Sequence, residues 1–231
     1  MKKFSKFIGS AIGVVAALAL SISTTQAAGL LIDPGFESGA PAQPNPIPIP
    51  GGVGGGWTVF NGAAYSTAHP ESGTYSLVEG EGAHSAWNFE AAYQVIGGVT
   101  ANQQYTLTAD FMATTVLSVY NPVYIQLDYL NAAGTDIGTV ETTPGHALAV
   151  QYGAPVIGTW YSATVTATAP AGAVYVAPYV AMMENGANLA AETIYWDNVD
   201  LTLVSVPEPS SLALLAMGLG IPFYFLRRRN S

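Results

Sequence analysis

Apolar residues recur at every second position in five runs of this chain, a spacing that fits extended strands and does not fit helices. The runs are rich in Thr, Val and Tyr, and turn-forming Gly, Pro and Asn residues separate them. In chain order they are residues 105–111, 123–129, 160–167, 173–180 and 194–203, with clear turns at 131–135 and 169–172. The pattern predicts an all-β sandwich formed by a single domain over residues 29–204.

The same alternation predicts which side chains form the core. In the first run Tyr105, Leu107, Ala109 and Phe111 face one way, and in the second run Val123, Ile125, Leu127 and Tyr129 do so. The tryptophans Trp57, Trp160 and Trp196 are also expected to be core residues. Residues 39–56 break the pattern with a Pro-rich and then Gly-rich stretch, which predicts a long surface loop inside the domain. A polyproline ligand for a partner is the alternative interpretation of that stretch.

Positive charge is confined to the two ends of the chain. The six Lys and Arg residues are Lys2, Lys3, Lys6 and Arg227–Arg229, and none lies between Lys6 and Arg227. Of the 15 acidic residues only Glu208 lies outside 29–204. Such a domain repels nucleic acid and has no Lys or Arg to hold a phosphate, so nucleic-acid partners are excluded. The chain has no Cys, which removes disulfides and thiolate metal sites.

The N-terminal residues predict export. Lys2, Lys3 and Lys6 precede an apolar stretch over residues 7–22, and small residues at 23–28 allow cleavage after Ala27 or Ala28. This order is typical of a secretory signal peptide, assigned here to residues 1–27. An uncleaved membrane anchor is the alternative.

The C-terminal residues carry three features in a fixed order. Val206-Pro207-Glu208-Pro209 comes first, an apolar span over 212–226 follows, and Arg227–Arg229 come last. This order resembles the PEP-CTERM sorting signal of exopolysaccharide-producing Gram-negative bacteria, here residues 206–229. The resemblance implies an exosortase as partner, acting near Val206, Pro207, Glu208 and Pro209. It also implies an intermediate anchored in the inner membrane and a final place on the cell surface or outside the cell.

The physical properties of this tail agree with that interpretation. Residues 210–226 would form a helix of about 25 Å, short for a hydrocarbon core of about 30 Å. Pro222 would kink the helix. Arg227, Arg228 and Arg229 would stop transfer and hold the end of the helix on the cytoplasmic side. The tail therefore predicts a weak C-terminal membrane helix that can be processed.

Motifs within the domain resemble jelly-roll carbohydrate-binding modules of the galactose-binding-like type. They are the Asp33–Glu37 opening followed by Gly56-Trp57, the Ser-Gly turn in 71–77, the pair of segments at 93–95 and 105–107, and the final strand at 194–199. The resemblance implies a jelly-roll β-sandwich. It also implies one structural calcium ion, with Asp33, Glu37 and Asp197 as ligands and carbonyls of the 72–75 turn completing the site.

Glycan contact in such modules uses aromatic platforms with polar side chains, often including Arg or Lys, which this domain lacks. Trp87, Tyr120 and Tyr124 are the candidate ligand-binding residues, in a chain that also offers Tyr65, Tyr152 and Tyr179. Most aromatic residues of strands are core residues, so each candidate competes with a purely structural role.

Three functions follow, and the chain is not expected to be an enzyme. The favoured one is an exported, surface-displayed, non-catalytic protein that contacts exopolysaccharide or extracellular matrix. The second is a structural or adhesive matrix subunit without specific glycan binding. The third is a jelly-roll glycan-active enzyme, for which Glu90, Asp128 and Glu141 are acidic candidates without a spacing that pairs them. His69, His84 and His146 fit no metal-binding spacing and are expected to be solvated loop residues, so no catalytic residue is assigned.

Overall fold

The computed structural model describes residues 29–39, 56–80, 88–117, 122–141, 155–184 and 192–204. Every regular element in these ranges is a β-strand, and no helix among them could cross a membrane. The predicted signal peptide, nearly all of the 39–56 loop and the tail with its predicted membrane helix lie outside the described residues.

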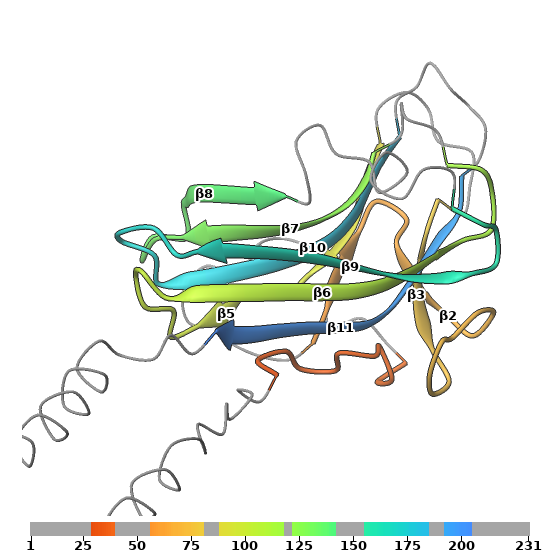
Figure 1. The fold of residues 1–231 in the computed structure, drawn as a ribbon, viewed down its shortest axis with the longest axis horizontal. Helices are drawn as coiled ribbons and strands as arrows, with labels where there is room; N and C mark the ends of the chain where they lie inside the picture. The colour runs from red at the N-terminus through yellow and green to blue at the C-terminus, as the bar shows by residue number, and fades with distance from the viewer. Residues whose placement is uncertain are drawn as a thin grey trace, which may run out of the picture.

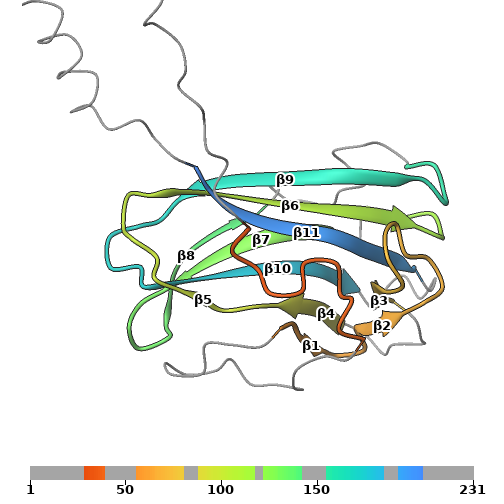
Figure 2. The same cartoon turned by 90° about the horizontal axis from the view of Figure 1, so that it is seen from below.

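The strands form two antiparallel sheets that pack as two layers (Figures 1 and 2). Sheet A has the order β1-β4-β10-β7-β8, and β5 also pairs with β10. Its strands are β1 (Thr58–Phe60), β4 (Asn88–Tyr93), β5 (Ile96–Gly97), β7 (Val123–Leu130), β8 (Asp136–Glu141) and β10 (Tyr175–Glu184). Sheet B has the order β2-β3-β11-β6-β9. Its strands are β2 (Ala64–Ser66), β3 (Ser76–Glu79), β6 (Gln104–Ala113), β9 (Trp160–Thr168) and β11 (Ile194–Val204). This all-β jelly-roll sandwich confirms the predicted fold class.

The five predicted runs correspond to β6, β7, β9, β10 and β11, the longest strands of the sandwich. The short strands β1, β2 and β5 have no detectable period because they span two or three residues each. The predicted turns are also confirmed. Gly134 N–H donates to the Asn131 carbonyl at 2.9 Å, and Ala173 N–H donates to the Pro170 carbonyl at 3.2 Å.

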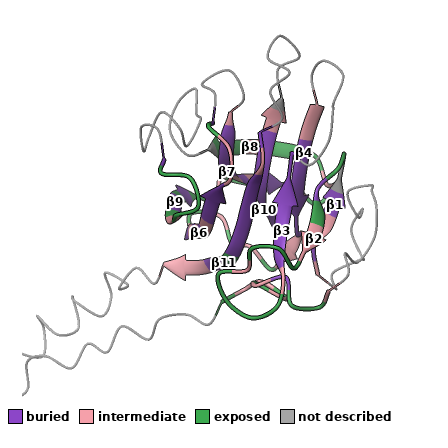
Figure 3. Cartoon of the chain, turned by 90° about the vertical axis from the view of Figure 1, so that its right-hand side faces the viewer, coloured by how far each residue is buried: buried purple, intermediate pink, exposed green. Residues whose placement is uncertain are grey.

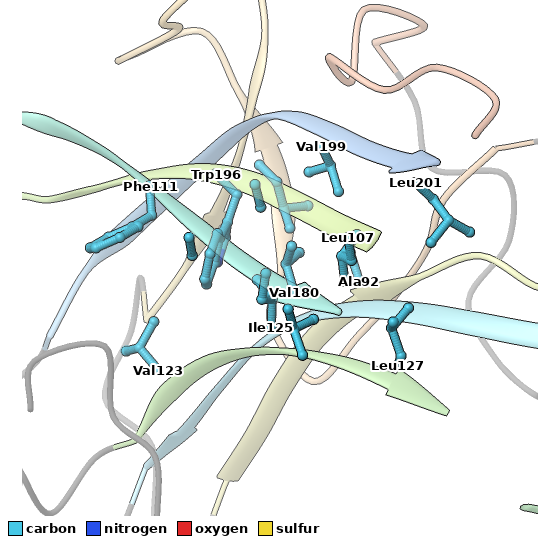
Figure 4. Packing of buried hydrophobic residues seen from close by; sticks show 14 of the residues in the cluster. Ala92, Leu107, Phe111, Val123, Ile125, Leu127, Val180, Trp196, Val199 and Leu201 are labelled. Atoms are coloured by element: carbon cyan, nitrogen blue, oxygen red, sulfur yellow. The ribbon is translucent and has the colours of Figure 1, made fainter. Parts of the chain in front are cut away.

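The core lies between the two sheets, where the inward side chains of both interdigitate (Figure 4). Leu107 and Phe111 of β6 meet Ile125 and Leu127 of β7 there, and all four side chains are fully buried. Trp57 and Trp196 are fully buried in the same cluster, as predicted. Removing this much apolar surface from water is the main favourable term for folding a domain that holds no disulfide.

Trp160 was predicted to be a core residue, and this prediction is wrong. It pairs with Met112, a residue that points away from the core, and both pack with Val78 and Tyr195 on the outer face of sheet B. Trp160 begins β9 and is only half-buried there. Its place follows from register, because a strand sends alternate side chains to opposite faces.

The first described segment, residues 29–39, runs alongside β11 and links the two sheets (Figures 1 and 2). Leu30 N–H donates to the Leu201 carbonyl at 2.8 Å on the side of sheet B. Towards sheet A, the Gln94 side chain just after β4 bonds both backbone groups of Ile32, at 3.0 and 2.5 Å. Because both polar groups of the amide are used, this side chain acts as a substitute for a strand partner.

Candidate functional site

The predicted calcium ligands lie where residues 29–39, the 71–75 turn and β11 meet. The Glu37 carboxylate accepts from Thr74 N–H at 2.9 Å through each oxygen and from Tyr75 N–H at 3.0 Å. The exposed Glu37 side chain therefore binds the turn through its N–H groups, whereas the prediction had the turn offering carbonyl oxygens. Gly73 has φ 66° at this point, and a Cβ there would overlap the Glu37 carboxylate.

Asp197 holds the other side of the same turn. Its Oδ2 accepts from Glu71 N–H at 2.9 Å and Ser72 N–H at 3.0 Å, and its Oδ1 accepts from Asn198 N–H at 2.7 Å. Burial raises the pKa of Asp197, and these three N–H groups oppose the shift by stabilising the charged form. Asp197 stands where the register of β11 shifts against β6 between residues 197 and 200. A β-bulge of this kind re-aims side chains, here towards the turn.

Asn198, in the bulge, adopts a left-handed backbone conformation with φ 48°. Its amide nitrogen lies 3.1 Å from Glu71 Oε2 and 3.3 Å from Asp110 Oδ2, so one neutral side chain donates to two carboxylates. Burial and the neighbouring Asp110 carboxylate raise the pKa of Glu71. An Asn is suited to this position because it tolerates φ above zero and carries two donors.

Asp33 does not join this group in the manner expected of a calcium ligand. Its carboxylate oxygens accept from Ser38 N–H at 3.1 and 3.2 Å, within its own loop. Across the described ranges no three His, Cys, Asp or Glu side chains are arranged to hold a metal ion. The Asp33, Glu37 and Asp197 set as placed does not fit the six to eight oxygen ligands of calcium, and the calcium ion stays a prediction.

A second candidate site is the outer face of sheet A, opposite the core. Aromatic side chains of three adjacent strands gather there and form what we call the outer tyrosine face: Phe89 and Tyr93 on β4, Tyr175 and Tyr179 on β10, and Tyr124 on β7. Tyr93 and Tyr179 stack with ring centroids 4.9 Å apart, and Phe89 and Tyr124 stack at 6.3 Å. Figure 3 shows how far burial extends through these strands.

Exposure is graded across this face. Tyr93, Tyr124 and Tyr179 keep 2%, 6% and 8% of their surface in solvent, whereas Phe89 and Tyr175 are half-buried. Burial, aided by the negative charge of Asp128, raises the pKa of Tyr179, so its phenol stays protonated at neutral pH. Phe89 and Tyr175 are therefore the rings of this face that a ligand could contact from solvent.

A polar row borders the tyrosines on β7 and β8. Gln126 Nε2 donates to Asp128 Oδ1 at 2.6 Å, and Thr139 Oγ1 lies 2.8 Å from the same oxygen. Thr139 Oγ1 also lies 2.9 Å from Asp136 Oδ2, so the hydroxyl can donate its single proton to either carboxylate. The row offers an amide, a hydroxyl and carboxylates beside aromatic rings, the groups that bind sugar hydroxyls.

The remaining predicted residues fall into two groups, those that the structure describes and those outside the described residues. Tyr124 and Asp128 belong to the outer tyrosine face and its polar row, and Glu90 is fully buried on β4. Glu141 ends β8 opposite Gln126. His69 is exposed, as expected. Its ring makes a T-shaped contact with Tyr195, with ring centroids 4.7 Å apart. Those that lie outside the described residues are Trp87, Tyr120, Tyr152, His84, His146, Val206–Pro209 and Arg227–Arg229.

Tyr93, Tyr175 and Phe89 were not singled out from the sequence, although a signal for this face exists. The run at 173–180 was interpreted as alternating, but β10 is apolar at nearly every position, which is typical of a strand covered on both faces. Residue parity on β7 then places Tyr124, Gln126 and Asp128 opposite the core face.

Solved structures of similar fold include carbohydrate-binding modules. TmCBM61 in complex with beta-1,4-galactotriose has 14% identity and a TM-score of 0.45, over 76% of this chain and 99% of that one. The CBM22-1 xylan-binding domain of Paenibacillus barcinonensis Xyn10C has 13% identity and a TM-score of 0.45, over 75% and 93%. The enzymatically active domain of tailspike protein 4 from bacteriophage CBA120 has 11% identity and a TM-score of 0.46, over 76% of this chain. This chain spans 21% of the length of that tailspike domain.

The sequence itself matches a family model at its C-terminal end. No curated protein matches the chain. Residues 205–229 match the PEP-CTERM protein-sorting motif, which confirms the assignment made from Val206–Pro209 and Arg227–Arg229. The chain therefore contains a jelly-roll β-sandwich followed by a PEP-CTERM protein-sorting motif.

Proposed function

We propose that this chain is an exported, non-catalytic surface protein that an exosortase sorts through its tail. In this proposal the jelly-roll domain binds a glycan of the exopolysaccharide or extracellular matrix on the outer tyrosine face. The observation that carries the glycan part is the row of Gln126, Asp128 and Thr139 beside the aromatic rings of β4, β7 and β10.

The sorting part is supported by the motif over residues 205–229 and by where the domain ends. β11 runs to Val204, the residue that precedes the motif. Recognition at Val206–Pro209 would then occur next to the domain, with Arg227–Arg229 holding the tail at the cytoplasmic side of the membrane until cleavage. Export through the signal peptide over residues 1–27 is part of the same proposal.

The charge of the domain narrows the glycan class. No Lys or Arg exists between Lys6 and Arg227, and Asp128 and Asp136 border the tyrosine face. A uronate or sulfate group brought to this face would meet like charge without a cation to pair with. We therefore propose that the ligand is a glycan without acidic groups, bound by ring stacking and by hydrogen bonds to its hydroxyls.

The two alternatives lead to different observations. A structural or adhesive subunit would self-associate and bind no glycan. A glycan-active enzyme would need two carboxyl groups that reach substrate, and Glu90, one of its candidates, has no solvent exposure. That burial supports the non-catalytic proposal.

Binding to soluble polysaccharides tests the glycan part. Neutral β-1,4-galactan and xylan serve as probes, and polygalacturonate serves as the acidic one. We expect binding to a neutral probe only, and Tyr175→Ala should weaken it about tenfold, or about 1.4 kcal/mol. Thr166→Ala, an exposed change on β9 of the other sheet, is the matched control and should leave binding unchanged. Absence of binding to every neutral glycan, with the fold intact by circular dichroism, would overturn the proposal.

Mass spectrometry of the cell-associated protein tests the sorting part. In a host with an exosortase, replacing Pro207, Glu208 and Pro209 with alanine should leave export intact and prevent removal of the tail. Replacing Arg227–Arg229 with neutral residues should instead let the short apolar span pass through the membrane. Retention of Arg227–Arg229 in the mature wild-type protein would show that the tail is not processed.

A further inference from the structure

Two fully buried glutamates lie at the same end of the sandwich, one from each sheet. Glu79 ends β3 in sheet B, where it stands opposite Ile194, and Glu90 lies on β4 in sheet A, opposite Met182. Both side chains have 0% exposure. Carboxyl groups are almost never buried to this extent without a partner that balances their charge.

The two carboxyl groups have unequal supplies of N–H donors. Glu90 accepts from Gly80 N–H at 2.6 Å through Oε2 and from the Asn88 side chain at 2.9 Å through Oε1. Glu79 accepts from the Trp196 indole N–H at 3.0 Å through Oε2. Its other oxygen, Oε1, is buried and has no hydrogen-bond partner. Glu90 is therefore the better supported carboxylate, and Glu79 is the group for which ionisation is unfavourable.

Among the described residues, no cationic group acts on Glu79. The described acidic groups at this end of the domain are Glu90 on β4, whose charge acts on Glu79, and Glu192, which is 1% exposed just before β11 and whose backbone carbonyl lies against Gly80. Trp196 on β11 and Met182 on β10 contribute no charge. The sequence has no Lys or Arg from residue 7 to 226, and His69, the one histidine among the described residues, is exposed beside Tyr195. Burial raises the pKa of Glu79 well above its usual range, the Glu90 charge adds to this, and the Trp196 hydrogen bond opposes it.

Gly80 connects this pair to the backbone of three segments. Its N–H bonds Glu90, and with φ 83° its Cα packs so closely on the Glu192 carbonyl that a Cβ would overlap that oxygen. A charge placed on Glu79 would thus act where β3, β4 and the start of β11 are in contact.

We propose that Glu79 is a neutral carboxylic acid at neutral pH and that its proton is a latch holding the two sheets together at this end of the sandwich. The acid form lets Glu79 sit beside the Glu90 carboxyl group without a counter-ion among the described residues. Loss of the proton puts a negative charge into the core next to Glu90, and the segment through Gly80 opens.

The pH dependence of the latch has a definite sign. The folded state binds the proton more tightly than the unfolded chain, in which a Glu has a pKa of about 4.3. The stabilisation is therefore fully present below about pH 4.3 and is lost as pH rises through the folded pKa. This is the reverse of a salt-bridged carboxylate, whose contribution is lost on acidification.

Infrared spectroscopy of the whole chain in detergent tests the protonation state. At neutral pH we expect the C=O band of a protonated carboxylic acid in the wild type, lost in Glu79→Gln and kept in the matched control Asp200→Asn. The wild type also gives a readout that needs no variant. The protection factor of the Gly80 amide, which compares its exchange rate with that of an unstructured amide at the same pH, should fall as the acid band disappears at alkaline pH.

Two results would overturn the latch. One is a wild-type spectrum without an acid band at neutral pH, which includes the case of a bound cation, seen as exchange at Gly80 that accelerates when a chelator is added. The other is an acid band that survives in Glu79→Gln, or a protection factor at Gly80 that does not change with pH while the band titrates.

Discussion

Glu37 and Thr74 are joined by hydrogen bonds from one N–H to both carboxylate oxygens, each 2.9 Å long. This contact ties the first described segment to the turn that enters β3, 37 residues further along the chain. Asp197 holds the same turn from β11 through Glu71 and Ser72. The opening segment and the last strand are thus fixed to one turn by carboxylates that accept backbone N–H groups.

Replacing Glu37 with Gln should lower the melting temperature by about 2–4 °C, since a charged acceptor for the Thr74 and Tyr75 amides is lost. Asp33→Asn should cost less, because Asp33 bonds Ser38 within its own loop. If backbone N–H groups are the partners of Glu37, the loss is equal in calcium and in chelator. A melting temperature that rises with calcium in the wild type, and no longer does so in Glu37→Gln and Asp197→Asn, would instead establish the predicted calcium ion.

Substitution of two glycines should separate backbone strain from steric overlap. Gly80 and Gly98 have φ 83° and φ 80°, so an alanine is strained in both, by about 1–2 kcal/mol. A Cβ at Gly98 meets nothing within 4 Å, whereas one at Gly80 overlaps the Glu192 carbonyl. Gly80→Ala should therefore lower the free energy of unfolding by clearly more than Gly98→Ala in chemical denaturation. Equal losses would mean that the 79–80 segment is not packed against Glu192.

Alkaline titration should show a buried phenol in Tyr129. The Tyr129 hydroxyl donates to the Ala167 carbonyl at 3.1 Å, and burial raises its pKa to about 12. A tyrosine in the unfolded chain has a pKa of about 10. The contribution of Tyr129 to stability is therefore complete below about pH 10 and is lost as pH rises towards 12. When phenolate absorbance is followed as pH rises, Tyr129→Phe should show one fewer tyrosine that ionises above about pH 10 than the wild type. An unchanged absorbance titration would place the Tyr129 hydroxyl in solvent.

Trypsin should leave residues 7–226 uncut, even in the unfolded protein, because no Lys or Arg occurs there. Survival in trypsin is therefore no measure of folding for this domain, and a protease that cuts at aromatic residues is required. Chymotrypsin should cut the domain in denaturant and spare Phe111 and Trp196, which are fully buried, in native buffer. Equal chymotrypsin cleavage with and without denaturant would contradict the buried core.

The long strands could be predicted because alternation requires only local sequence. Leu107 and Ile125 face inward for the reason the pattern gives, and β6 and β7 begin and end within a few residues of the predicted runs. The face of Trp160 follows from the same rule. Ala163, Val165 and Ala167 of β9 are buried and the residues between them are exposed, so alternation places Trp160 on the outer face. The prediction failed because it assigned the large ring to the core without regard to its position in the run.

For the two sites, part of the arrangement could be predicted from the sequence and part could not. Spacing alone could not indicate that Glu79 and Glu90 come together, because their contact depends on the packing of one sheet on the other. Likewise, the resemblance to carbohydrate-binding modules implied that Asp33, Glu37 and Asp197 lie near the 72–75 turn, and Glu37 and Asp197 do contact it. What the sequence does not contain is the orientation of the peptide groups in that turn, which decides whether N–H or carbonyl groups meet the carboxylates.

The position of β11 also determines how the domain responds to mechanical load. β11 is the central strand of sheet B, paired with β3 and β6, and it ends at Val204, next to the sorting motif. In a chain held by its tail, tension would be applied along β11, across the direction of its inter-strand hydrogen bonds. Those bonds are then sheared together and are not peeled one at a time. The anchoring strand is thus the one whose extraction requires breaking both of its ladders at once.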